Sequence, residues 1–202
     1  MDFIAVLNYE HLDNGLFLTS FAKSLAKRNK QGIILHESSE YTERIIQTGV
    51  MREEATIRCL KELNHRLVAL FADEGISTIG LNGHQKSLLL KSTNNNQLKL
   101  NAAMLRSLPD KPMILISALA SVKNAHLPVI ADVSEMAAIM RKEFDLSYID
   151  TFSIKEKSEI IVDDLPGILT PAKSKKEILE EHVPLSFRSY TGAIRLHSPS
   201  TF

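Results

Sequence analysis

Residues 52–81 read REEATIRCLKELNHRLVALFADEGISTIGL. Apolar side chains recur in the first part of this stretch at spacings of three and four residues, as on the buried face of a helix: Ile57, Leu60, Leu63, Leu67, Leu70 and Phe71. Gly75 marks the end of the pattern, and the apolar residues that follow it are typical of a strand. The stretch therefore predicts a long helix over 52–73 and a strand over 76–81.

Two short apolar runs precede this helix, FIAVL at 3–7 and GIILH at 32–36, and an amphipathic pattern lies between them at 16–28. Continuous apolar runs of this length are typical of strands buried on both faces. Strand, helix and strand in this order predict a parallel pair joined by a right-handed crossover. With further strands expected at 126–131 and 159–162, the fold class is α/β, a three-layer αβα sandwich with a mostly parallel open sheet.

Three smaller elements complete the expected fold. Apolar residues at 88–91 and 97–100 flank Asn94, Asn95 and Asn96, which indicates an antiparallel hairpin with a polar tip. Pro112 suits the first turn of a helix, so we expect a helix from there to about Lys123. A shorter helix is predicted over 135–141.

Composition narrows the classes of function. The chain has 202 residues, of which 44% are hydrophobic, enough for one sizeable core. Lys and Arg number 24 and Asp and Glu number 24, so no net charge attracts nucleic acid or an anionic membrane. No signal peptide or membrane-spanning run is present, and a single cysteine, Cys59, suits a reducing compartment. We therefore expect a cytoplasmic protein with neither nucleic acid nor membrane as its partner.

Three segments taken in order resemble one family: 48–83, 126–134 (HLPVIADVS) and 160–169 (IIVDDLPGIL). They look like the long helix and strand, the substrate strand and the nucleotide loop of N-acetylglutamate kinases, members of the amino-acid-kinase superfamily. The resemblance implies ATP and Mg²⁺ as cofactors if the protein is active. It also implies one domain, 1–202, with residues 1–134 as the substrate and dimerisation half and 135–202 as a truncated nucleotide-binding half.

The chain departs from the family where the chemistry takes place. The family has a lysine and two glycines after its first strand, whereas residues 7–11 here read LNYEH. Three glycines follow a histidine after the family's second strand, whereas residues 36–39 read HESS. Such lysines neutralise phosphoryl oxygens, and such glycines let backbone N–H groups approach them. The substrate arginine of the family is also missing from 47–50, although Arg44 and Arg52 lie nearby.

The resemblance nevertheless assigns candidate site residues. The candidates for substrate binding are Asn8, His36, Ser38, Ser39 and Arg52, and those for nucleotide binding are Asp163, Asp164, Gly167 and Ile168. Asp150 is the candidate for the aspartate that opens a helix in the catalytic motif of the family. A second alignment starts that helix near 135 and gives the place to Asp132 or Glu135.

The last part of the chain offers two further expectations. Lys173, Lys175 and Lys176 lie near the place of the family's second catalytic lysine, but lysines on a polar helix are usually a solvated face. Residues 182–192 (HVPLSFRSYTG) look like the closing strand of aspartokinase-type members.

Other chemistry finds less support. His11 and His36, with Glu10 and Glu37 beside them, follow the first two strands and could form a metal or acid–base cluster. No fixed ligand spacing supports the cluster, so we predict no metal and favour loop residues that fill space left by the glycines.

Two functions therefore remain. The first is an acetylglutamate-kinase-like protein that is catalytically impaired and serves as a subunit or as a module that binds a small acyl-amino acid. The second is a divergent ATP-dependent kinase of an arginine-type pathway, which phosphorylates the side-chain carboxylate of an N-acylated glutamate. The helix at 52–73 predicts a homodimer, as in the family, although its apolar face could equally be covered by its own sheet.

Overall fold

The computed structural model describes residues 1–28, 30–40, 42, 44, 52–155 and 165–202. A seven-stranded sheet lies at its centre. Its strands, in spatial order, are β10 (Ile168–Leu169), β11 (Ile194–His197), β9 (Ile149–Phe152), β1 (Phe3–Leu7), β2 (Gly32–His36), β6 (Met113–Ser117) and β3 (Thr78–Asn82). Neighbouring strands are parallel, except that β10 is antiparallel to β11. The predicted α/β class with a mostly parallel sheet is confirmed.

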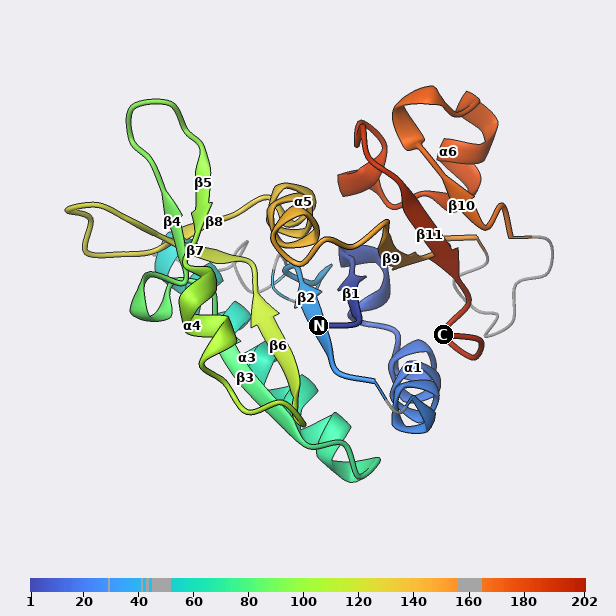
Figure 1. Cartoon of the computed structure of the whole chain (residues 1–202), viewed down its shortest axis with the longest axis horizontal. Coiled ribbons are helices and arrows are strands. Elements are labelled where there is room, and N and C mark those ends of the chain that lie inside the picture. Colours follow the sequence, from blue (N-terminus) through green and yellow to red (C-terminus); the bar gives the residue numbers. More distant parts are fainter. Residues whose placement is uncertain (29, 41, 43, 45–51, 156–164) are drawn as a thin grey trace.

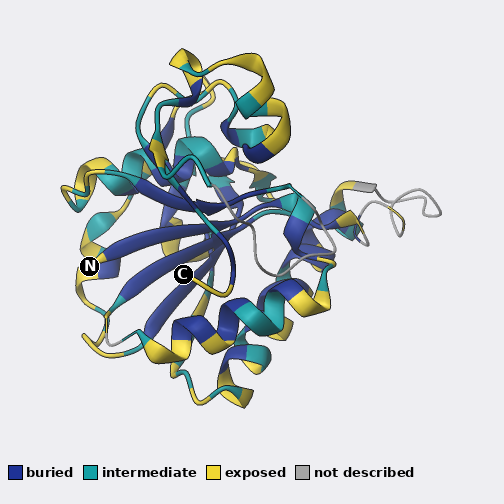
Figure 2. Ribbon diagram, turned by 90° about the vertical axis from the view of Figure 1, so that its right-hand side faces the viewer, coloured by how far each residue is buried: buried dark blue, intermediate teal, exposed yellow. Residues whose placement is uncertain are grey.

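Helices cover both faces of this sheet (Figures 1 and 2). On one face, α1 (Gly15–Lys27) and α3 (Arg52–Asp73) pack through Phe21, Leu67 and Phe71 against the odd-numbered residues of β1. On the other face, α5 (Val133–Glu143) packs through Met136 and Met140 against Ile4 and Val6. Since every residue of β1 and β2 is buried, the two apolar runs at the start of the chain form strands covered on both sides.

A second, four-stranded sheet lies beside the first. Its strands, in spatial order, are β5 (Leu98–Leu100), β4 (Leu89–Lys91), β7 (Leu119–Val122) and β8 (Val129–Ile130). β4 and β5 are antiparallel, so the predicted hairpin is confirmed. The described part of the chain also contains α4 (Ala102–Arg106), α6 (Lys176–His182) and the 3-10 turns η1 (Tyr9–His11), η2 (Gln85–Ser87), η3 (Pro171–Lys173) and η4 (Leu185–Phe187).

The helix expected from Pro112 to Lys123 is wrong, because β6 and β7 occupy this stretch. Residues 113–117 read MILIS and are all buried in the interior of the sheet between β2 and β3. A strand in that position needs apolar side chains on both faces, which a continuous apolar run provides. Pro112 lies just before the first strand residue, where its missing N–H group leaves the ladder intact.

The end of the chain also differs from expectation. Residues 182–192 do not form the closing strand, because they hold the last residue of α6 and the turn η4. The closing strand is β11, where alternate residues of Ile194–His197 are buried. The strand expected at 126–131 is limited to β8, and the one expected at 159–162 lies outside the described residues.

The long helix α3 has the predicted bounds, and its apolar side faces the protein's own sheets. Leu60, Leu67 and Phe71 are buried, whereas exposed positions such as Arg58 and Glu62 are charged. The apolar face is therefore covered within one chain, and the homodimer stays a prediction. Among the described helices, none combines the length and apolar composition needed to cross a membrane.

Candidate functional site

Strands β1 and β2 end side by side, because Leu7 is in register with His36. Ligands of open α/β sheets bind at this carboxyl edge, where the loops that follow the strands meet. The loops here are η1 after β1, residues 37–39 after β2 and residues 153–155 after β9. The turn η4, from the far end of the chain, packs against the same edge through side-chain contacts with Asn8 and Glu10.

Glu37 directs its carboxylate at the loop that follows β1. Its Oε2 accepts a hydrogen bond of 2.9 Å from the backbone N–H of Tyr9. Burial raises the pKa of Glu37, while hydrogen bonds from Ser186, the Tyr9 backbone and Asn8 act to lower it. Glu10 makes a parallel contact, accepting a 3.1 Å hydrogen bond from the backbone N–H of Leu185. Carboxylates thus accept hydrogen bonds from backbone N–H groups at this edge of the sheet.

Asn8 joins three segments of the chain at the same edge. Its Nδ2 donates to Oγ of Ser186 at 2.8 Å, and its Oδ1 accepts from Oγ1 of Thr151 at 2.6 Å. Asn8 and Thr151 are fully buried. The side chain predicted to bind substrate therefore has both of its polar atoms in contact with the protein.

His36, the last residue of β2, is buried beside Asn64 of α3. Its Nδ1 lies 3.0 Å from the carbonyl oxygen of Glu37, and its Nε2 lies 3.1 Å from Nδ2 of Asn64. Because Asn64 Nδ2 is a donor, these contacts place the imidazole proton on Nδ1. Burial lowers the pKa of His36 to about 4, so the ring is neutral near pH 7.

The other substrate candidates lie along the loop after β2 and at the start of α3. Ser38 is half-buried, and Ser39 is buried with its Oγ 3.4 Å from Oγ1 of Thr42. Arg52 is the first residue of α3. The structure brings Asn8 and His36 to one edge, with Glu37 and Ser186 between the loops. Their role in binding a substrate stays a prediction.

Asp150 lies inside β9 and opens no helix. It is 1% exposed, and its Oδ1 lies 2.8 Å from Nε of Arg195 and 2.7 Å from Nε2 of His197. Asp132, which the second alignment names, caps α5 by accepting hydrogen bonds from the backbone N–H groups of Ser134 and Glu135. These contacts join β9 to β11, and the catalytic role of Asp150 stays a prediction.

Of the four candidates for nucleotide binding, the structure describes two. Asp163 and Asp164 lie outside the described residues. Gly167 has a positive φ of 68° and its carbonyl oxygen accepts from the backbone N–H of Leu196, while Ile168 is 58% exposed in β10. Lys173, Lys175 and Lys176 are exposed, as expected of a solvated face.

His11 and His36, the histidines of the possible metal or acid–base cluster, contact different parts of the protein. His11 lies with Nε2 3.2 Å from the carbonyl oxygen of Ser153 and stacks on Phe17, and His36 faces Asn64. In the part of the chain that the structure describes, no three His, Cys, Asp or Glu side chains could share a metal ion. His11 lies in the turn η1 and His36 is the last residue of β2.

Sequence patterns did not indicate two contributors to this edge, Ser186 and the pair Ser153 and His182. Ser153 Oγ lies 3.0 Å from Nδ1 of His182, and burial lowers the pKa of that histidine. No local motif marks these residues. Their proximity to the first strands depends on β9 and on a turn more than 140 residues downstream of β1.

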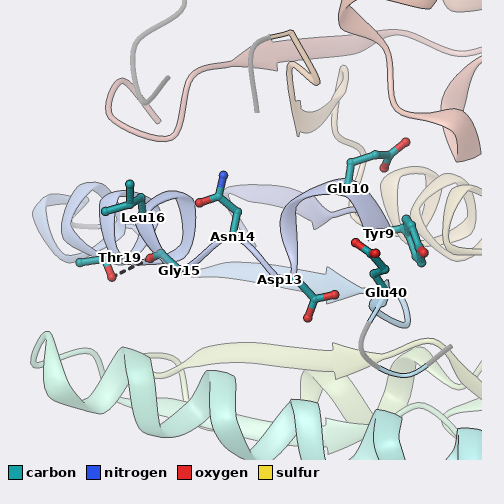
Figure 3. A pocket seen from close by; sticks show the side chains of 8 residues that line it. All are labelled: Tyr9, Glu10, Asp13, Asn14, Gly15, Leu16, Thr19 and Glu40. Atoms are coloured by element: carbon teal, nitrogen blue, oxygen red, sulfur yellow. Dashed lines mark hydrogen bonds between the residues drawn. The ribbon is translucent and has the colours of Figure 1, made fainter. Parts of the chain in front are cut away.

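An open pocket of about 720 Å³ lies next to the edge, at the start of α1 (Figure 3). It is lined by Tyr9, Glu10, Asp13, Asn14, Gly15, Leu16, Thr19 and Glu40. Asn14 caps α1, accepting a hydrogen bond of 3.0 Å from the backbone N–H of Phe17. The charged groups among these lining residues are carboxylates. Glu40 forms an exposed ion pair with Arg44, and the carboxylates of Glu10 and Asp13 at the start of the first helix are repulsive toward a phosphate group.

The chain resembles known proteins in structure but not in sequence. No protein-family model and no curated protein sequence matches the chain. Solved structures do match. An isopentenyl phosphate kinase superposes with a TM-score of 0.59 at 11% identity, over 76% of this chain and 72% of that one. The aspartate kinase from Synechocystis gives 0.57 at 10% identity, over 84% of this chain and 29% of that one. The protein smu.665 from Streptococcus mutans UA159 gives 0.56 at 10% identity, over 80% of this chain and 75% of that one. The chain therefore has the amino-acid-kinase fold.

Proposed function

We propose that this protein uses the amino-acid-kinase fold without phosphoryl transfer and acts as a small-molecule-binding or subunit module. One observation carries the proposal: the backbone N–H of Tyr9, in the turn η1 that follows β1, donates to the carboxylate of Glu37. A donor at this place would have to face phosphate in a kinase. Here it is already paired with a negative charge from the neighbouring loop.

The energetic argument follows from what phosphoryl transfer requires. Catalysis of this reaction is mostly positioning and neutralisation of charge on phosphoryl oxygens. Removal of one preorganised donor typically raises a barrier by about 2.7–4 kcal/mol. Residues 7–11 and 36–39 lack lysine and glycine, and they add Glu10 and Glu37. The combined effect is too large for ordinary kinase turnover.

The proposed ligand is a small acyl-amino acid, the class that the family resemblance implies. The pocket beside α1 contributes Glu10, Asp13 and Glu40. These carboxylates favour a ligand that carries little negative charge on that side. N-acetylglutamine and N-acetylglutamate form a matched pair of probes, because they differ by one carboxylate.

Thermal unfolding in the presence of each ligand tests the proposal. A ligand at 100 times its dissociation constant that binds only the folded state adds about 2.7 kcal/mol of stability. We expect no shift of Tm with Mg·ATP and a shift with an N-acetylated amino acid. The Asp13→Asn variant, which removes one lining charge, should bind N-acetylglutamate more tightly than the wild type.

A clear shift with Mg·ATP would contradict the proposal and favour the divergent kinase that phosphorylates an N-acylated glutamate. Isopentenyl phosphate, the compound after which one structurally similar kinase is named, is a further probe for a phosphate-bearing substrate. If none of these ligands shifts Tm, the small-molecule role is wrong and the subunit role remains as the proposal.

A further inference from the structure

The end strand β8 leaves one edge of the four-stranded sheet open. It is hydrogen-bonded to β7 on one side, where Ile130 lies opposite Leu119. The backbone N–H of Ala131 donates to the carbonyl oxygen of Ala118, so the backbone polar groups of residues 129 and 131 face β7. The backbone polar groups of residues 128, 130 and 132 alternate with these and therefore point away from β7, toward the open edge.

This open edge carries exposed apolar side chains. Ile130 is 50% exposed and Leu127 is 41% exposed. Because Ile130 lies opposite the buried Leu119, its side chain is on the face of the sheet that packs against α3. There it borders a pocket of about 260 Å³ between β8 and the start of α3, which is also lined by Ile57 and Pro128.

The other end strand of the sheet, β5, is closed to a further strand. Oε1 of Glu135 in α5 accepts a hydrogen bond of 3.0 Å from the backbone N–H of Leu98, the first residue of β5. Natural sheets often cover their edges in this way, because an open edge pairs with other strands. At the β8 edge, by contrast, no described residue accepts a hydrogen bond from the backbone N–H of Asp132, and that of Ile130 points away from β7.

The open edge is complementary to itself. Two copies of a strand that are related by a two-fold axis pair antiparallel about one residue, whose N–H and C=O groups must both point outward. Ile130 meets this condition. Asp132 has extended backbone, so its N–H group meets the C=O group of the partner's Pro128. The N–H group that Pro128 lacks is not needed, because the carbonyl oxygen of Asp132 already accepts from the backbone N–H of Met136.

We propose that two copies of this chain associate through β8 and join their four-stranded sheets into one continuous sheet. The two Ile130 side chains pack together on the α3 face, beside the pocket that Ile57 lines. The chain has a net charge of zero, so no net repulsion keeps two copies apart. A few hydrogen bonds and one apolar pair make a small interface, so we expect association in the micromolar range. The dimer does not depend on which ligand the protein binds.

Disulfide cross-linking of the full chain tests the register of this pairing. The single cysteine, Cys59, is first replaced by serine. Cα atoms of a hydrogen-bonded antiparallel pair lie about 5.5 Å apart, within the reach of a disulfide. Ile130→Cys should therefore form a covalent dimer on mild oxidation. Leu127→Cys is the matched control on the same arm, because its two copies lie roughly 20 Å apart along the paired strands and cannot be bridged.

Sedimentation velocity measures the association without a cross-link. Ile130→Glu places two carboxylates at the axis and should weaken dimerisation at least about tenfold. Leu185→Glu changes a side chain in η4 that is 70% exposed, and this control should associate like the wild type. Circular dichroism and Tm verify that both variants are folded.

Three results would overturn the proposal. The first is a wild-type protein that stays monomeric at concentrations up to about 1 mM. The second is equal cross-linking of Ile130→Cys and Leu127→Cys, which indicates random collision. The third is a dimer that Ile130→Glu leaves intact, which would favour the dimer through the helix at 52–73 that the family resemblance implies.

Discussion

Nδ2 of Asn64 donates a hydrogen bond of 3.1 Å to Nε2 of His36, so the folded protein holds this imidazole in its neutral form. Burial lowers the pKa of His36 to about 4 from an ordinary value of 6.5. Between pH 4 and pH 6.5, His36 therefore binds a proton in the unfolded chain but not in the folded chain. Stability from this residue is present above pH 6.5 and is lost as pH falls toward 4, by about 3 kcal/mol in all.

Urea unfolding between pH 4 and pH 7 checks this first prediction. The His36→Gln variant should be less stable than the wild type at pH 7, because its contacts with Asn64 and Glu37 are disturbed, but its stability should change less with pH. His126→Gln, at an exposed position, is the control and should follow the wild type. A wild-type stability that stays flat from pH 7 to pH 4 would contradict the buried neutral imidazole.

Glu37 gives a pH dependence of the opposite sign. Because burial raises its pKa, the folded chain holds a proton that the unfolded chain releases, and stability from Glu37 falls as pH rises above 4.5. The Glu37→Gln variant keeps an acceptor for the backbone N–H of Tyr9 and removes the buried charge. Its stability relative to the wild type should be greater at pH 8 than at pH 4.5, as measured by urea unfolding at both pH values. An unchanged difference would show that the carboxylate is solvated.

The third prediction concerns Gly83, where another segment of the backbone lies very close. A Cβ atom on Gly83 would clash with the carbonyl oxygen of Leu119 and would lie 2.9 Å from that of Ser117. Backbone atoms cannot move away at low cost, so Gly83→Ala should destabilise the protein by about 2–3 kcal/mol.

Gly15→Ala is the matched substitution for this test. Nothing lies within 4 Å of a Cβ atom at Gly15, the first residue of α1, and alanine there should stabilise by up to about 1 kcal/mol. Chemical unfolding of both variants measures the difference. Equal effects would mean that the backbone at Gly83 does not lie as close to the carbonyl groups of Leu119 and Ser117 as described.

The fourth prediction concerns Asp150. Removal of one partner from a buried charged group leaves the others uncompensated, so Asp150→Asn should lower the free energy of unfolding by about 2–3 kcal/mol. The value is kept below that of a fully buried pair because the side chain of Arg195 is 28% exposed. Arg106→Gln, which breaks the surface pair with Glu143, should cost less than about 1 kcal/mol. Similar losses in both variants would show that Asp150 contributes no more than a surface charge.

The parts of the fold that were predictable are those in which one segment carries its own signal. The spacing of Leu60, Leu63 and Leu67 marks α3, and the apolar runs at 3–7 and 32–36 mark β1 and β2. The helix predicted from Pro112 was wrong because proline favours the first turn of a helix and is also tolerated just before a strand. The run MILIS after it is apolar without helical spacing, which was the stronger signal.

Only the residues of the candidate site that lie at the ends of β1 and β2 were predictable from the sequence. Asn8 follows β1, and His36 and Glu37 lie at the end of β2, so their meeting depends on a β-α-β unit that is visible in the sequence. Ser186 reaches Asn8 across 178 residues, and no local pattern indicates such a contact. The same limit affected Asp150, where a match to a short motif suggested a helix and pairing with β1 and β11 requires a strand.

The order of strands in the large sheet has a consequence for how the chain folds. β1 pairs with β9 through Ala5 and Asp150, and β11 inserts between β9 and β10. A chain emerging from the ribosome cannot complete one side of β1 until residue 150 is available, nor the interior of the sheet until residue 197 is. Such distant pairings delay folding, because loops must close before the contacts that stabilise them form. Residues 1–134 alone would leave one edge of the central strand β1 unpaired, so the two halves distinguished in the sequence should fold and unfold as one cooperative unit.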